Sequence, residues 1–204
     1  MNRVLRHLAV FVALSLTLAC LAFSQANQGV NLKDHPFEAN LAGGTTLRLH
    51  LHEGDFQVVG TDSDKISVKA EGKNLDLARN IKIHLKRAGD TVDRKLSHVP
   101  RKELAVTITV PRTTNLYARM HGGDLSVEGI TGDKDLELTG GDLTVQVGNP
   151  AQYGVVDASV RFGDVKGDQF GDPKGWLGNS IHKEGPGKYK LHAHVFAGDL
   201  VLKP

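Results

Sequence analysis

The chain has 204 residues, 24% of them charged, with a formal net charge of +2 at pH 7. This near balance provides no basic stripe, so nucleic-acid binding has little support from the sequence. The single cysteine, Cys20, lies in the N-terminal segment, so a chain that begins after it has no disulfide, thiolate metal site or cysteine nucleophile.

Residues 1–24 are typical of a secretory signal peptide. Arg3 and Arg6 give it a positive start, and the apolar run at 8–23 is shorter than the roughly 20 residues that span a membrane. Small residues at Ala22 and Ser24 predict cleavage after Ser24. We therefore expect export to the periplasm, the outer-membrane surface or the medium, with 25–204 as a single domain that has no transmembrane segment.

A lipid anchor is the alternative to simple export. Cys20 follows Thr17-Leu18-Ala19, a loose lipoprotein-type motif. Thr17 stands where a larger aliphatic residue is usual, and the apolar run continues past the cysteine. These two features favour Cys20 as an ordinary residue of the signal peptide.

Apolar and polar residues alternate through much of 31–121, which predicts strands with one buried and one solvated face. The alternating segments are 47–52, 56–58, 66–70, 81–85 and 104–110. Residues 74–80 could form a turn or two of helix, and the charged stretch 86–103 is predicted to be a loop. This half of the chain is the less regular one.

Residues 122–204 contain the clearest repeats. The unit Gly-Asp-apolar-x-apolar occurs at 54–58, 123–127, 141–145 and 198–202, with a truncated copy at 163–165. From Asp124 the steps are 18, 22 and 35 residues, and the longest step contains a Gly- and Pro-rich insertion at 167–187. Glycine permits a corner at positive φ, and aspartate can accept backbone N–H bonds there.

A period of about 20 residues indicates stacked coils that share one core. We therefore predict an all-β fold, a β-solenoid or β-helix-like stack of short strands separated by Gly-Asp corners. A β-sandwich is the alternative, because turn signals every 8–12 residues would fit it as well.

Two stretches carry a family resemblance. VPR at 110–112 leads into HGGDLSV at 121–127, and GPGKYKL at 185–191 leads into AGDL at 197–200. Both resemble a bacterial family of putative adhesins, the β-strand-repeat domains of unknown function. The resemblance covers most of residues 25–204 and is weakest at 31–103. It implies stacked β-strands and a cell-envelope setting, and it supplies no catalytic residues.

Histidine is the most unusual residue type. His50 and His52 share one strand face, as do His192 and His194, and four histidines could converge on zinc or copper if the two strands were neighbours. Because each pair alternates with apolar residues, the solvated face of a strand is the favoured interpretation. The sequence therefore predicts no metal site.

Three other features of the sequence could support chemistry. The Gly-Asp corners suggest calcium, but one aspartate per roughly 20 residues is too sparse for a cage of six or more oxygens. Asp133, Asp135 and Glu137 could serve a glycosidase, yet a solvated acidic edge is favoured. Trp176 in the 172–178 loop could stack on a sugar, although plugging the core beneath the loop is favoured. We predict no catalytic residues and no cofactor.

These observations predict a non-enzymatic, exported envelope protein, an adhesin or surface-binding module whose partner is a surface, a glycan or an envelope protein. The alternatives are an accessory scaffold of an envelope complex and a polysaccharide-acting β-helix enzyme. Self-association would be favoured if the ends of the stack were uncapped.

Overall fold

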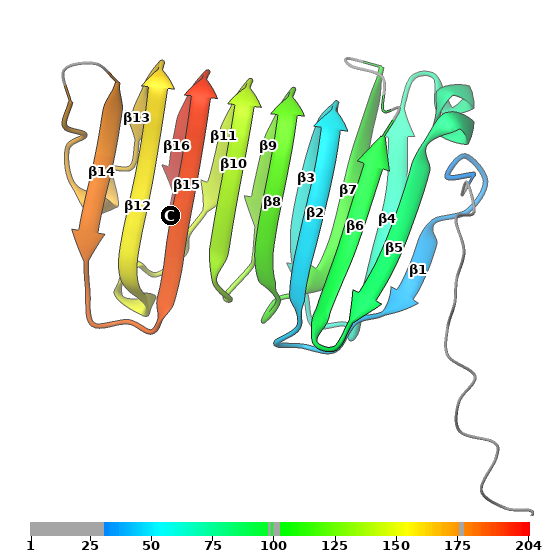
Figure 1. Ribbon diagram of the computed structural model, residues 1–204, viewed down its shortest axis with the longest axis horizontal. Helices are drawn as coiled ribbons and strands as arrows, with labels where there is room; N and C mark the ends of the chain where they lie inside the picture. Colours follow the sequence, from blue (N-terminus) through cyan, green and yellow to red (C-terminus); the bar gives the residue numbers. More distant parts are fainter. Residues whose placement is uncertain (1–30, 98, 100–102, 176–177) are drawn as a thin grey trace, which may run out of the picture.

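The computed structural model describes residues 31–97, 99, 103–175 and 178–204, which form two β-sheets facing each other (Figure 1). Within these ranges there is no α-helix, and the only helical segments are three 3-10 turns, η1 (Leu75–Asn80), η2 (Pro150–Gln152) and η3 (Asp168–Phe170). The all-β prediction is confirmed, as is the short helical segment expected at 74–80. The predicted signal peptide and Cys20 lie outside the described residues.

The strands are short and follow the predicted alternation. They are β1 (Phe37–Asn40), β2 (Thr46–Glu53), β3 (Asp55–Thr61), β4 (Lys65–Gly72), β5 (Lys82–Ala88), β6 (Thr91–Ser97), β7 (Leu104–Pro111), β8 (Asn115–Gly122), β9 (Leu125–Glu128), β10 (Lys134–Gly140), β11 (Leu143–Gln146), β12 (Tyr153–Phe162), β13 (Val165–Lys166), β14 (Asn179–Glu184), β15 (Tyr189–Ala197) and β16 (Leu200–Lys203).

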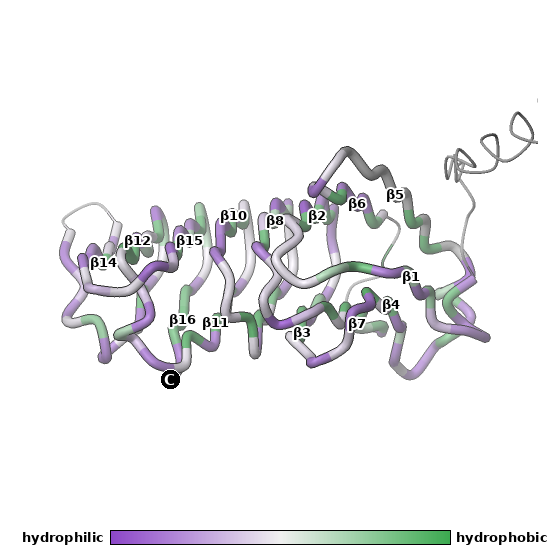
Figure 2. The backbone as a smooth tube through the Cα atoms, turned by 90° about the horizontal axis from the view of Figure 1, so that it is seen from below, coloured by the Kyte–Doolittle hydropathy of each residue, from purple (hydrophilic) through white to green (hydrophobic). Residues whose placement is uncertain are grey.

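Each sheet has eight strands. Sheet A has the order β1-β4-β7-β3-β9-β11-β16-β13, and sheet B has the order β14-β12-β15-β10-β8-β2-β6-β5. Both mix parallel and antiparallel pairs, and over the described residues neither sheet closes on itself. Figure 2 shows the two sheets edge-on as two facing rows. The buried apolar side chains of both sheets belong to one core cluster. This two-layer layout is sandwich-like, which is the alternative that the turn spacing offered.

The Gly-Asp corners carry the chain from sheet B to sheet A. They link β2 to β3, β8 to β9, β10 to β11, β12 to β13 and β15 to β16. All five predicted units are therefore corners, and the truncated copy leads into β13, which has two residues. Neighbouring strand pairs then stack in parallel and in register, for example Leu143 of β11 against Leu125 and Leu200.

The corner glycines form a column because the stacked backbones touch there. Gly141 has φ 116°, and a Cβ placed on it would lie 2.1 Å from the carbonyl oxygen of Gly123. The same approach recurs along the column, at 2.0 Å for Gly123 against Gly54 and 1.9 Å for Gly198 against Gly141. Glycine is required both by the backbone angle and by the close contact.

The corner aspartates form a second column of hydrogen bonds. The amide of Asp142 donates to Asp124 Oδ1 (3.2 Å), that of Asp199 to Asp142 Oδ1 (3.0 Å), and that of Asp164 to Asp199 Oδ1 (3.0 Å). Each of these carboxylates therefore caps a backbone amide of the neighbouring strand pair. The prediction that corner aspartates accept backbone N–H bonds is confirmed for Asp124, Asp142 and Asp199, with the donor in the neighbouring strand pair.

The strand pairs that these corners join do not stack in chain order. The C-terminal pair β15–β16 lies between β10–β11 and β12–β13, and β2–β3 lies between β6–β7 and β8–β9. At the C-terminal end the chain forms β12–β13 first and then returns, so that β15–β16 fills the gap beside β10–β11. The C-terminus consequently lies part-way along the stack and not at either end of it (Figure 1).

Antiparallel strands complete both ends of the stack. At one end β4 pairs with β7 and β1 with β4, while β5 pairs with β6. At the other end β14 pairs with β12. The predicted loop at 86–103 is therefore wrong over most of its length, because β5 and β6 form a hairpin there. The insertion at 167–187 likewise contributes an edge strand, β14.

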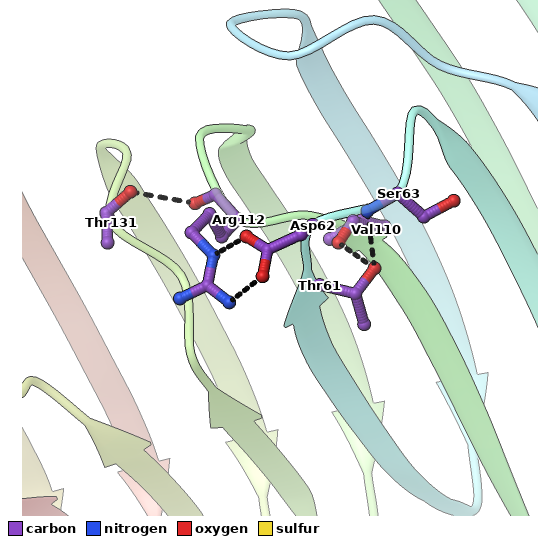
Figure 3. Close-up of polar contacts among 6 residues, drawn as sticks. All are labelled: Thr61, Asp62, Ser63, Val110, Arg112 and Thr131. Carbon is purple, nitrogen blue, oxygen red and sulfur yellow. Dashed lines mark hydrogen bonds and ion pairs between the residues drawn. The ribbon is translucent and has the colours of Figure 1, made fainter.

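The corner opposite the Gly-Asp column is held by polar contacts (Figure 3). Arg112 Nε and an Nη donate to the two carboxylate oxygens of Asp62, at 2.6 and 3.0 Å, which joins the β3–β4 turn to the β7–β8 turn. The hydroxyl of Thr131 donates to the carbonyl of Arg112 at 3.1 Å and so adds the β9–β10 turn. Because the ion pair is exposed, its main effect is to fix geometry rather than to stabilise strongly.

One core position is occupied by a lysine. Lys134 is paired in register with Leu116 and Leu191 and is 2% exposed. Its Nζ donates to the carbonyl of Gly132 (3.0 Å) and to the hydroxyl of Tyr153 (2.8 Å). Burial lowers the pKa of Lys134 to about 8 and raises the pKa of Tyr153 to about 12.

This lysine is expected to make stability rise with pH. Its folded-state pKa lies below its unfolded value of 10.5, so the unfolded chain binds more protons above about pH 8 and the free energy of unfolding increases from about pH 8 to about pH 10. The full effect is at most about 3 kcal/mol. Urea unfolding of Lys134→Met across this range should lack the rise, whereas Lys183→Met on the exposed edge strand should retain it. An unchanged pH slope in Lys134→Met would contradict the assignment.

Within the described residues, no helix has the length and apolar character needed to cross a membrane.

Candidate functional site

The outer face of sheet B carries charged, histidine, tyrosine and serine side chains in register across neighbouring strands. We call it the ladder face, because its residues stand in rows across neighbouring strands. The first row, in register from β14 to β6, is His182, Asp157, His192, Asp135, Tyr117, Arg48 and Asp93. The second is Ser180, Ser159, His194, Glu137, Arg119, His50 and Lys95. These residues point outward because they alternate with core residues along each strand.

Arg119 is the centre of the ladder face. Its Nη2 lies 2.9 Å from Asp135 Oδ1 and its Nε lies 2.9 Å from Glu137 Oε2. Its guanidinium carbon also lies 3.6 Å from the ring centroid of Tyr117, with Arg48 over the same ring at 5.1 Å. The arginine is 22% exposed, so these contacts are partly shielded from water and fix both carboxylates and the ring.

Histidines at the β14 end of this face have polar partners. His182 Nδ1 makes a short contact with Asp157 Oδ1, and this hydrogen bond and charge raise the pKa of His182 above its usual value. His194 Nδ1 lies 2.9 Å from the hydroxyl of Ser159. These pairs place hydrogen-bonding groups of both polarities in one strip of the face.

An aromatic pair adjoins this strip. Phe162 at the end of β12 and Phe196 of β15 are 60% and 49% exposed, and their ring centroids lie 5.4 Å apart at 81°. Large apolar side chains this exposed are costly to keep in water, and an exposed cluster often marks an interaction surface. The ladder face therefore combines apolar and ionisable contacts.

The outer face of sheet A has a different character. Its central row, in register across five strands, contains Thr107, Gln57, Ser126, Thr144 and Val201. The side chains of this row are uncharged, and Gln57 Nε2 and Ser126 Oγ both donate to Oε1 of Glu128, at 3.3 and 3.0 Å. This row therefore lacks the arginines, histidines and aromatic rings that stand on the ladder face.

The four histidines considered for a metal do not converge. All four stand on the ladder face, as their alternation predicted, but β2 with His50 and His52 is separated from β15 with His192 and His194 by β8 and β10. Three strand spacings amount to about 14 Å, which is too far for one ion. His52 instead contacts His121 of β8, with ring centroids 5.5 Å apart.

The acidic residues considered for catalysis divide into two groups. Asp135 and Glu137 share the outer face of β10, and both pair with Arg119. Asp133 lies apart from them in the turn before β10, where its Oδ1 accepts the amide of Lys190 at 2.9 Å. Trp176, also considered for binding, lies outside the described residues.

Sequence reasoning missed Arg119, Tyr117 and Asp157. The available signal was the alternation in β8, where Tyr117 and Arg119 stand between Leu116, Ala118 and Met120. Alternation alone identified the outward positions but could not place β8 beside β10, so the pairing of Arg119 with two carboxylates of another strand was not visible.

A hollow lies near the other end of the ladder face. It has a volume of about 440 Å³ and is lined by His52, Glu53, Lys95, Ser97 and Val99. The hollow is formed by the ends of β2 and β6, so it is separate from the cluster around Arg119.

No family model matches the chain, and no curated protein matches it in sequence. Among solved structures, a putative cell adhesion protein from Clostridium sporogenes matches 82% of this chain and 98% of its own, with 12% identity and a TM-score of 0.52. A putative adhesin from Bacteroides fragilis aligns over 82% of this chain and 95% of its own, with 10% identity and a TM-score of 0.26. The first likeness shows a shared fold, and the second is too distant to support an argument.

Proposed function

We propose that the protein is an exported, non-enzymatic envelope protein that binds a surface, glycan or partner protein through the ladder face. The observation that carries the proposal is the concentration of charged, histidine and aromatic side chains on one sheet face, around Arg119 and Tyr117. Arginine and tyrosine are enriched at the centres of binding interfaces. The putative cell adhesion protein that shares the fold supports the same role.

We further infer that the five Gly-Asp strand pairs and β6–β7 are turns of a β-solenoid ended by antiparallel strands, within one domain spanning 25–204. The glycine and aspartate columns support this classification, because both arise from coil-on-coil stacking. Short edge strands such as β1 and β13, and charges on β14, are features that discourage edge-to-edge association. They favour binding through a face over self-association through an end.

The proposal predicts that binding depends on the ladder face. Beads coated with the protein should capture envelope fractions or cells, and a triple variant with Arg48, Tyr117 and Arg119 changed to serine should capture at least about tenfold less. A matched variant with Gln57, Thr107 and Thr144 changed to alanine on sheet A should bind like the wild type. Circular dichroism would verify that both variants fold.

Other outcomes would favour the alternative functions. An accessory scaffold would leave coated beads inert and co-purify with one envelope protein from the native host. A polysaccharide-acting enzyme would release reducing ends from cell-wall or capsular polysaccharide, and Asp135→Asn with Glu137→Gln would abolish that release. Equal capture by the ladder-face and sheet-A variants would refute the proposed binding face.

A further inference from the structure

Asp135, Glu137 and His192 bring three metal-ligating groups together on the ladder face. One ligand atom from each lies within 4.8 Å of the other two. Asp135 and Glu137 come from β10, and His192 comes from β15, which pairs with β10 in parallel and places His192 directly opposite Asp135. The grouping therefore follows from strand register and joins residues 57 positions apart in sequence.

The strands that carry these groups hold them in place. β10 is paired with β8 on one side and β15 on the other, and β15 is paired with β12 on its far side. Core residues Leu136 and Leu138 alternate with the two carboxylates and are at most 1% exposed. Ligands on interior strands of a packed sheet are positioned more accurately than ligands on a loop.

Arg119 orients the carboxylates without using all of their oxygens. Its Nη2 contacts Oδ1 of Asp135, and its Nε contacts Oε2 of Glu137. The second oxygen of each carboxylate can then serve another ligand. A hydrogen-bonding partner on the opposite oxygen is a common way to fix the direction of a metal-binding carboxylate.

The chemistry of the three groups selects the kind of ion. One imidazole nitrogen with two carboxylate oxygens suits zinc and similar first-row divalent ions, whose bonds to these ligands are about 2.0–2.2 Å. Ligand atoms on one such ion lie about 3.3 Å apart, which small side-chain rotations from the present positions would achieve. Calcium would require six or more oxygens, and the site offers two carboxylates.

We propose that Asp135, Glu137 and His192 bind one zinc-class divalent ion on the ladder face, with the remaining coordination position open to solvent. Asp157 stands in register on the other side of His192 and adds negative charge beside the imidazole. The site differs from the four-histidine arrangement considered in the sequence, since it uses a single histidine of that set. It stands whether or not the ladder face binds an envelope partner.

Zinc titration of the full-length protein, free of any histidine tag, tests the proposal. Calorimetry should show one equivalent bound at micromolar zinc, and His192→Gln and Glu137→Gln should each weaken binding at least about tenfold. His50→Gln is the matched control, because His50 is half exposed on the same face beside Asp93 and should bind zinc like the wild type.

Histidine ring resonances distinguish this site from other histidines. The His192 signals should shift or broaden with the first equivalent of zinc, ahead of those of the His52 and His121 pair. Full zinc binding by folded His192→Gln would overturn the proposal, as would earlier shifts at His52 or an absence of micromolar binding in the wild type. Binding of zinc with no loss of bead capture after chelation would leave the site intact and show that the proposed adhesion does not use it.

Discussion

Replacing Gly141 by alanine is expected to lower the free energy of unfolding by about 4 kcal/mol. The added Cβ would lie 2.1 Å from the carbonyl oxygen of Gly123, and the residue has φ 116°, where side chains are strained. Separating the two backbones would break hydrogen bonds at this corner. The Gly141 amide donates to the carbonyl of Ala197 at 2.9 Å, and the Gly123 amide donates to the carbonyl of Gly140 at 3.0 Å. Thermal unfolding should show a midpoint roughly 12 °C lower.

Gly148→Ala is the matched control for this substitution. Gly148 also has a positive φ, 64°, but a Cβ built on it has no neighbour within 4 Å. Alanine there should cost only the backbone strain, about 1 kcal/mol. If both variants lost the same free energy of unfolding, the contact between the stacked backbones would contribute little. The backbone angle alone would then make the corner glycines necessary.

Replacing Arg94 by methionine is expected to raise the free energy of unfolding by about 2 kcal/mol and the thermal midpoint by roughly 6 °C. Arg94 is 0% exposed, and its Nε, Nη1 and Nη2 have no hydrogen-bond partner among the described residues. Its guanidinium carbon lies 4.1 Å from the ring centroid of Phe37, which offsets part of the desolvation cost. Methionine keeps an unbranched, apolar side chain at this position.

The pKa of Arg94 also indicates that its buried charge lowers the free energy of unfolding. Burial lowers the pKa to about 10, so the folded protein binds this proton less tightly than the unfolded chain, and the charge is destabilising below that pH. Lys95→Met on the exposed side of the same strand should change stability by less than about 0.5 kcal/mol. A lower thermal midpoint for Arg94→Met would contradict this expectation. It would show that the guanidinium makes stabilising hydrogen bonds in the folded protein.

Local patterns were sufficient to identify most strands and the corners. Leu47, Leu49 and Leu51 alternate with polar residues, and all three are buried because β-strand geometry sends alternate side chains to opposite faces. The prediction of a loop at 86–103 was wrong for the same reason. Arg94 stands at an inward position between Val92 and Leu96, where alternation would lead one to expect an apolar residue. A charge at a core position removed the apolar signal from a strand that exists.

The candidate site could be predicted residue by residue but not as a group. Asp135 with Glu137, and His192 with His194, were recognisable as outward pairs on separate strands. Whether the acidic pair lies beside the histidine pair depends on the order of the strands in sheet B. That order places β15 against β10. Arg119, which holds the two carboxylates, belongs to a third strand whose neighbour the alternation could not identify.

The sequence by itself determined the all-β class, the inward and outward faces of most strands and the position of every Gly-Asp corner, because these depend on residues a few positions apart. Only the tertiary structure decided the order of the strand pairs, the antiparallel ends and the clustering of Asp135, Glu137 and His192. Those features arise from pairing between segments that are distant in sequence. The strands have similar patterns of apolar residues, so the local pattern does not select one neighbour over another. A strand such as β15 carries no local mark that distinguishes a place beside β10 from one beyond β12, so only packing of the whole chain selects it.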